Sequence, residues 1–170
     1  MKKLTLVCLV AVFGLVNYSQ AQSEYKSAIG LRVGLPVAAS LKHFITDAGA
    51  IEGHAGFWHE APGWGGYNYF SFGAMYQHHF PIGDIPGFKW YVGGGILGQV
   101  YSYSSRWKDY YGSDHYSNFG LGFHPVGGVD YKFAKIPLAV SADVMPTFFV
   151  GDLYYNFRTL GGVAARYTFR

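Results

Sequence analysis

Hydrophobic and polar residues alternate with a period of two along most of the chain. In the segment 27–34, Ile29, Leu31 and Val33 fall on one face, while Gly30 and Arg32 fall on the other. The same alternation recurs in the segments 37–45, 50–58, 68–80, 90–101, 119–133, 138–148 and 163–169. Alternation of this kind is typical of β-strands with one apolar face, whereas a helix would show a period of 3.6. The pattern therefore predicts an all-β chain of eight strands.

Composition indicates that these strands lie in a membrane. Aromatic residues make up 19% of the chain and charged residues 14%, against about 25% charged residues in typical globular proteins. So few charges cover a water-exposed surface poorly, yet no apolar run after the N-terminal segment approaches the roughly 20 residues of a membrane-spanning helix. An even number of strands that closes into a barrel pairs every backbone group and leaves no edge in lipid. We therefore predict an eight-stranded antiparallel transmembrane β-barrel.

The charged residues within the predicted strands share the face opposite the apolar one. An Arg or Lys on the lipid face costs about 2–4 kcal/mol at the middle of the bilayer. The interior of an eight-stranded barrel is just wide enough to be filled by side chains. We therefore predict that the charged residues form a network of ion pairs and hydrogen bonds that plugs the lumen. They are Arg32, Lys42, Glu52, Asp130, Lys132, Asp143 and Arg166.

The connections between the predicted strands alternate in character. Those at 46–50, 81–87 and 134–137 are short and contain glycine or proline, as expected of periplasmic turns. Those at 59–66, 104–118 and 150–157 are longer and richer in polar or aromatic residues, and we expect them to be outside loops. The first connection, near Leu35 and Pro36, is very short. Aromatic residues near the strand ends are expected to form interfacial girdles: Phe44, Trp58, Tyr67, Phe80, Trp90, Tyr103, Phe133 and Phe149.

The first 21 residues have the three parts of a Sec signal peptide. Lys2 and Lys3 precede an apolar run over residues 4–16, and small residues at Ser19 and Ala21 follow it. We expect cleavage after Ala21, leaving residues 22–170 as the barrel domain with both termini inside. Without Lys2 and Lys3, the 13 basic residues fall to 11 against 10 acidic ones, so the charge gives no reason to expect a nucleic-acid partner. Cleavage also removes Cys8, the single cysteine, and with it any disulfide or thiolate site.

The signal peptide, the eight alternating strands, the short turns and the closing sequence "GGVAARYTFR" together resemble the small outer-membrane barrels of the OmpX and OmpA type. The resemblance implies an outer-membrane location, contact with outer-membrane lipid and lipopolysaccharide, and insertion by the barrel-assembly machinery. That machinery would read Tyr167 and Phe169 as the assembly signal. Family barrels usually end in an aromatic residue, whereas here Phe169 is penultimate and Arg170 follows.

A glycine motif on the fifth predicted strand raises a different possibility. Within "WYVGGGILGQVYSY" (residues 90–103), the residues Gly93-x-Gly95-x-x-Gly98 match the G-x-G-x-x-G pattern of dinucleotide-binding loops. A phosphate-binding loop would open a helix, but strand alternation continues beyond Gly98. We interpret the motif as a bend in a membrane strand, with Gly93 and Gly95 facing inward. Gly94 and Gly98 then face lipid, where a neighbouring aromatic ring can cover them, and no nucleotide is expected.

Histidines suggest a metal site only weakly. Alternation places His54, His79 and His124 on the inward face, with Glu52 on the same side as His54. However, the chain contains no H-x-x-x-H or H-E-x-x-H spacing, and the adjacent His78 and His79 point to opposite faces of a strand. We predict neither a metal site nor a cofactor.

The longest predicted outside loop contains the remaining candidate chemistry. Its mixture of aromatic and cationic residues suits contact with sugars, lipopolysaccharide headgroups or a protein partner. The residues are Arg106, Trp107, Lys108, Tyr110, Tyr111 and His115. The same loop contains Asp109, Ser113, Asp114, His115 and Ser117, which could serve hydrolytic chemistry, but no G-x-S-x-G nucleophile motif occurs in the chain.

These observations favour a non-enzymatic outer-membrane barrel with a structural or interaction role. Its lumen is plugged by charged side chains, and its loops are displayed outside. Two alternatives remain: an enzyme that modifies lipid or lipopolysaccharide, and a narrow pore.

Overall fold

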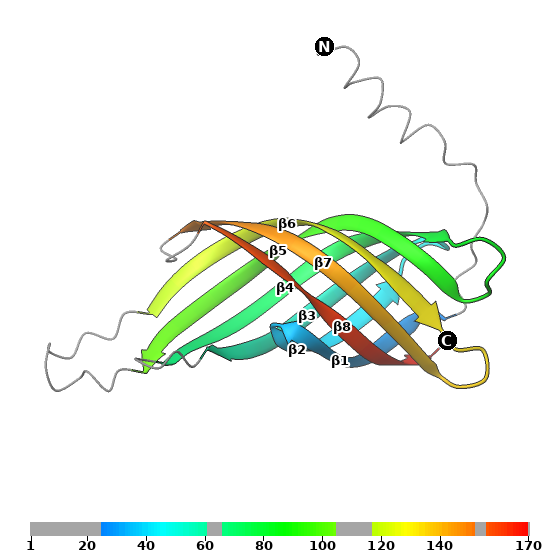
Figure 1. The fold of residues 1–170 in the computed structure, drawn as a ribbon, viewed down its shortest axis with the longest axis horizontal. Helices are drawn as coiled ribbons and strands as arrows, with labels where there is room; N and C mark the ends of the chain where they lie inside the picture. Colours follow the sequence, from blue (N-terminus) through cyan, green and yellow to red (C-terminus); the bar gives the residue numbers. More distant parts are fainter. Residues whose placement is uncertain (1–24, 61–65, 105–116, 152–155, 170) are drawn as a thin grey trace, which may run out of the picture.

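The computed structural model describes residues 25–60, 66–104, 117–151 and 156–169, which form eight antiparallel strands closed into a barrel (Figure 1). No helix among these residues is long and apolar enough to cross a membrane. The predicted eight-stranded barrel is confirmed. The strands are β1 (Ser27–Leu35), β2 (Val37–Phe44), β3 (Gly49–Glu60), β4 (Gly66–Pro81), β5 (Phe88–Ser104), β6 (Ser117–Lys132), β7 (Leu138–Gly151) and β8 (Phe157–Phe169).

Pairing of the first strand with the last closes the barrel. Ser27 of β1 lies opposite Phe169 of β8, and the ladder continues to Leu35 opposite Gly161. Each of the other strands pairs with its neighbours in the sequence. Closure therefore provides hydrogen-bonding partners for strand backbones on both sides, which a structure in lipid requires.

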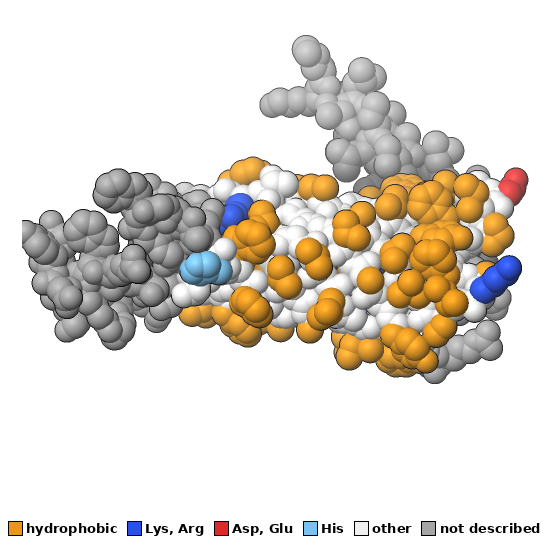
Figure 2. All heavy atoms as spheres, turned by 60° about the horizontal axis from the view of Figure 1, so that its bottom comes forward, with side chains coloured by type: hydrophobic (Ala, Val, Ile, Leu, Met, Phe, Trp, Pro, Cys, Tyr) orange, Lys and Arg blue, Asp and Glu red, His pale blue; other side chains and the backbone are white. Residues whose placement is uncertain are grey.

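Burial alternates along the strands as the sequence predicts. In β2, Ser40 and Lys42 are buried while Ala39 and Leu41 are exposed. On the outer surface, the face in Figure 2 shows hydrophobic side chains over the barrel wall and charged ones towards its two ends. Such a wall is compatible with a lipid environment.

The two ends of the barrel differ. The turns after β2, β4 and β6 lie at the same end as the start of β1 and the end of β8, here called the inner end (Figure 1). The short connections predicted there are confirmed, as is the very short first connection, in which Pro36 alone separates β1 from β2.

At the opposite, outer end the strands run further than the sequence pattern predicts. β3 reaches Glu60, β7 reaches Gly151 and β8 begins at Phe157, so parts of the predicted loops belong to strands. Pairing of backbone groups continues there although the alternation of side chains weakens, because the ladder does not depend on side-chain polarity. The ranges 61–65, 105–116 and 152–155 lie outside the described residues.

Three aromatic residues predicted for the girdles instead lie at inward positions: Phe44, Phe149 and the half-buried Trp58, which is opposite Tyr69. Phe44 is 5% exposed and Phe149 is 4% exposed, because both occupy inward positions of the alternation. By contrast, Phe80 stacks on Trp90 with 4.5 Å between ring centroids. A position near a strand end therefore predicts a girdle residue only if the alternation also places its side chain on the outward face.

The glycine motif lies within β5, paired with β4 and β6 on either side, so it opens no helix. A Cβ atom at Gly98 would lie 2.7 Å from Cζ of Phe72, which covers this glycine as predicted. At Gly94 the nearest atom would be the backbone oxygen of His124, at 3.1 Å, so an aromatic ring is not its cover. A Cβ atom at Gly95 would lie 2.6 Å from Cβ of Met75, so this glycine permits the close approach of β4.

A charge on the lipid-facing wall tests the placement of the barrel in a bilayer. Leu31, at the middle of β1, is 65% exposed. We expect Leu31→Arg to lower the free energy of unfolding by about 2–4 kcal/mol, because the side chain would lie near the bilayer midplane. Guanidinium titration of the protein in phospholipid vesicles measures this loss.

Val150→Arg is the matched control, because Val150 is also exposed (57%) but lies at the outer end of β7. It should cost at most about 1 kcal/mol near the interface. Equal losses for the two variants would contradict the assignment of this wall to lipid.

Candidate functional site

Side chains fill the lumen in two main tiers, and a small apolar cluster of Tyr25, Ala28, Phe44, Ala50 and Ala139 lies beyond them at the inner end. The inner tier is charged and polar, and it includes Arg32, Lys42, Glu52 and Arg166, each 0% exposed. The outer tier is largely apolar and contains a buried cluster that Leu35 packs against. Along β7, for example, Asp143 of the inner tier precedes the members of the apolar cluster. That cluster consists of Met75, Tyr91, Leu97, Val126, Met145, Phe149 and Leu160.

The first ion pair of the inner tier joins β1 to β7. The guanidinium of Arg32 binds the carboxylate of Asp143 through two nitrogens, and the Nη1–Oδ2 distance is 2.7 Å. The hydroxyl of Tyr91 donates a further hydrogen bond to Asp143 Oδ2 at 2.9 Å. This planar two-point contact orients both groups more strictly than a single hydrogen bond would.

The second ion pair joins β8 to β3. The guanidinium of Arg166 binds Glu52 through Nη2, and its other nitrogens donate to Ser40 Oγ and Ser141 Oγ, each at 2.7 Å. Glu52 also accepts hydrogen bonds from Ser40 Oγ and from Gln77 Nε2, each at 2.8 Å. Glu52 and Arg166 therefore connect five side chains, one from each of five strands.

The third ion pair joins β2 to β6. Lys42 Nζ lies 2.8 Å from Asp130 Oδ2 and also 4.9 Å from the ring centroid of Tyr91. Tyr25, which lies just before β1, donates a hydrogen bond to Asp130 Oδ2 at 3.0 Å. Burial, followed by the nearby Asp130 carboxylate, raises the pKa of the Tyr25 phenol well above its ordinary value, so this donor stays protonated.

The three pairs balance one another in charge. Three basic side chains pair with three different carboxylates, and each pair connects strands that are not neighbours in the barrel. Transferring ions from water costs several kcal/mol each, and pairing with further hydrogen bonds offsets that cost. The arrangement is an electrically neutral plug of paired side chains rather than a row of free charges.

Lys132 is the exception among the residues predicted for the network. It is half-buried at the inner end of β6, and its Nζ donates to the backbone oxygens of Phe133 and Ile136 in the following turn. The alternation of the strand predicted that Lys132 faces inward, but alternation does not indicate how deep in the lumen a residue lies. At the rim, the turn carbonyls are closer partners than the carboxylates.

Several partners in the plug were not singled out from the sequence. Ser40, Ser141 and Gln77 are uncharged, and Tyr25 precedes the first strand, so a search for charges misses them. Alternation places the side chains of these partners on the inward face, so the sequence could have indicated that they face the lumen. They are Ser40, Gln77, Tyr91 and Ser141. Their specific pairings depend on the register between strands, which alternation does not provide.

Three buried polar residues lie near the junction between the tiers. His54, His124 and Ser71 are 5%, 3% and 0% exposed, and the two imidazoles and the hydroxyl have no hydrogen-bond partner among the described residues. His54, His79 and His124 all face inward, as predicted. Within the described part of the chain, no group of three or more His, Cys, Asp or Glu side chains is placed to hold a metal ion.

The remaining candidate residues from the sequence lie elsewhere. Tyr167 and Phe169, expected as the assembly signal, are exposed on the outward-facing side of β8. The expected loop contact surface falls outside the described residues, as does the Asp114 and His115 pair considered for hydrolytic chemistry. The loop residues concerned are Arg106, Trp107, Lys108, Tyr110, Tyr111 and His115.

Comparison with known proteins identifies the fold. No protein-family model and no curated protein matches the chain. Among solved structures, Neisserial surface protein A (NspA) superimposes with a TM-score of 0.59 and 17% identity, covering 84% of this chain and 93% of that chain. The N-terminal β-barrel domain of Pseudomonas aeruginosa OprF gives a TM-score of 0.60 and 16% identity, covering 88% of this chain and 100% of that chain.

The chain therefore has the fold of the small eight-stranded outer-membrane β-barrels, as its resemblance to them implied. At these identities the similarity concerns the fold and does not extend to function.

Removing one partner of a buried ion pair tests the plug. We expect Arg166→Met to lower the free energy of unfolding by about 3–5 kcal/mol, because Glu52 would remain buried without its main counter-charge. The double variant Glu52→Leu with Arg166→Met should recover most of this loss. Chemical unfolding in detergent, followed by tryptophan fluorescence, measures both.

Lys132→Met is the control, since Lys132 lies outside the three pairs. It should cost about 1 kcal/mol, the order of a lost hydrogen bond. If the double variant were no more stable than Arg166→Met alone, the two residues would not be coupled and the ion-pair interpretation would be wrong.

Proposed function

We propose that this protein is a structural or interaction protein of the bacterial outer membrane, with a sealed lumen and outward-displayed loops. The observation that supports this most is the combination of an apolar outer wall with three buried ion pairs inside it. The barrel is thus adapted to lipid outside and to rigidity inside.

The plug argues against the pore alternative. Arg32 with Asp143 and Arg166 with Glu52 lie in the same buried tier, and each charge is already satisfied by a partner. An ion crossing the lumen would have to separate these pairs in a low-dielectric interior, at the cost of exposing unpaired charges. Displayed loops on a rigid scaffold are then the region where interactions would be made.

The route to the membrane is part of the same proposal. A Sec signal over residues 1–21 would direct export, and the barrel-assembly machinery would read Tyr167 and Phe169 during insertion. The exposure of both aromatic side chains at the end of β8 supports their availability for such reading. In the membrane, lipid and lipopolysaccharide would surround the wall, and the aromatic and cationic residues at 106–115 would face external partners.

Conductance in planar lipid bilayers tests the sealed lumen. The purified protein should insert without producing discrete current steps. A variant in which both tiers are thinned (Lys42→Ala, Glu52→Ala and Arg166→Ala with Leu97→Ala and Phe149→Ala) should conduct ions if it still gives a strand-dominated circular dichroism spectrum. Reproducible unitary steps from the unaltered protein would contradict the proposal and support the pore.

A further inference from the structure

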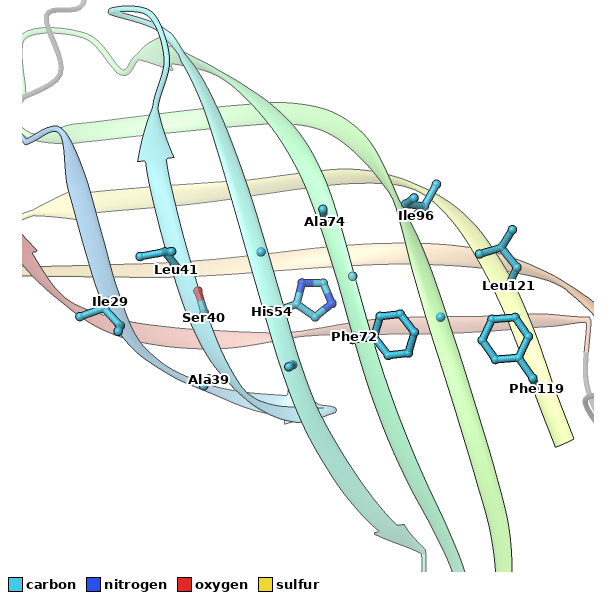
Figure 3. Close-up of a pocket in the computed structure, with 14 residues that line it drawn as sticks. Ile29, Ala39, Ser40, Leu41, His54, Phe72, Ala74, Ile96, Phe119 and Leu121 are labelled. Atoms are coloured by element: carbon cyan, nitrogen blue, oxygen red, sulfur yellow. The ribbon is translucent and has the colours of Figure 1, made fainter. Parts of the chain in front are cut away.

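The lipid-facing wall formed by β1–β6 is hollowed by an apolar trough of about 610 Å³ (Figure 3). Its floor consists of small residues, namely Ala39, Gly53, Ala55 and Ala74. Larger apolar side chains surround the floor, and they are Ile29, Leu41, Phe72, Ile96, Phe119 and Leu121.

Strand register creates the trough. Leu41, Gly53 and Ala74 lie opposite one another on consecutive strands, and Ala39 lies opposite Ala55 in the adjacent row. Small residues thus meet across three strands, although they are separated in the sequence. A Cβ atom at Gly53 would meet nothing nearer than the backbone oxygen of Gly73, at 4.0 Å, so the hollow is open above this glycine.

The position of the trough in the wall indicates hydrocarbon as its filling. Three of its floor residues, Gly53, Ala55 and Ala74, lie near the middle of β3 and β4, where a lipid-facing wall meets acyl chains. Its volume is in the range of about 300–1,000 Å³ typical of ligand pockets. A neighbouring barrel wall is convex and would rest on the raised side chains, leaving the floor empty and without van der Waals contacts. A flexible acyl chain can reach the floor.

The inner end of the trough leads to a polar group at the barrel rim. Ile29 and Leu41 lie opposite each other. Ser27 and His43 form the next pair on the same face, two residues closer to the inner end. Ser27 Oγ and His43 Nδ1 are 2.8 Å apart and exposed. Lys26 is exposed at the same rim, where it directly precedes Ser27 in the chain, and its backbone is held by hydrogen bonds to Phe169 and Phe44. An exposed cation at the same rim as exposed hydrogen-bonding groups complements a phosphate.

We propose that the trough binds one acyl chain of an inner-leaflet phospholipid, whose phosphate lies at Lys26, Ser27 and His43. The chain runs from this rim over Leu41 to Gly53 and Ala55. This site rests on the membrane location proposed above and adds a specific, stoichiometric lipid to it. The lipid fills a void in the wall and so stabilises the part of the barrel that contains the short strands β1 and β2.

Native mass spectrometry of the full chain tests the trough. The protein is purified in a mild detergent, equilibrated with palmitoyl-oleoyl phosphatidylglycerol and released from the micelle in the gas phase. The unaltered protein should retain one phospholipid. We expect Gly53→Leu, whose side chain would occupy the floor, to reduce that adduct about tenfold. Ala74→Leu is a second filling variant, in case Gly53→Leu folds poorly.

Gly127→Leu is the matched control. Gly127 is an exposed strand glycine, and a Cβ atom there would meet nothing within 4 Å, yet this residue does not line the trough. The variant should keep the single adduct. Persistence of the adduct in both filling variants, or its equal loss in Gly127→Leu, would overturn the site. A dimer that the filling variants abolish would instead assign the trough to a second copy of the chain.

A charge substitution tests the headgroup end separately. Lys26→Gln should weaken retention of phosphatidylglycerol several-fold, whereas Lys135→Gln should not, since Lys135 is exposed in the turn between β6 and β7. Equal retention in the two variants would overturn the placement of the phosphate. If the protein were not a membrane barrel at all, every variant would lack the adduct and the strand-dominated spectrum would be lost as well, which distinguishes the two failures.

Discussion

Backbone hydrogen bonding without water is the constraint on which this structure depends. In hydrocarbon an unpaired N–H or C=O group costs several kcal/mol, so a sheet can exist there only if its last strand pairs with its first. The ladder from Ser27 opposite Phe169 to Leu35 opposite Gly161 provides that closure. Closure in turn divides every strand into a lipid face and a lumen face. The apolar wall, the plug and the trough all follow from this division.

The lumen face is where the chain concentrates its buried charge. The interior of an eight-stranded barrel is just wide enough for its side chains, so a buried ion needs partners within the protein. Arg32, Lys42 and Arg166 do so with three carboxylates on non-adjacent strands. These pairs link distant parts of the wall, and under the proposed function they close the interior to ions. Rigidity of this kind suits a scaffold that holds loops in place, as the proposed structural or interaction role requires.

Alternation predicted the strands and the inward face of the charged residues, because a period of two records directly which side of a strand meets lipid. It did not predict depth or register. Lys132 has the right parity but lies at the rim, and Phe44 and Phe149 lie near strand ends but point into the lumen. The trough is likewise invisible in the sequence, since Ala39, Gly53 and Ala74 become neighbours only through the pairing of β2, β3 and β4. Pairings such as Arg166 with Glu52 required the closed barrel.

Heat-modifiable gel migration of the protein in an outer-membrane fraction tests the closed membrane barrel most directly. A barrel held by a continuous ladder resists detergent until it is boiled, so unheated and boiled samples should migrate differently. The unheated protein should also give a strand-dominated circular dichroism spectrum. Identical migration with and without boiling, a helical spectrum, or recovery of the protein in the soluble periplasmic fraction would contradict the closed membrane barrel.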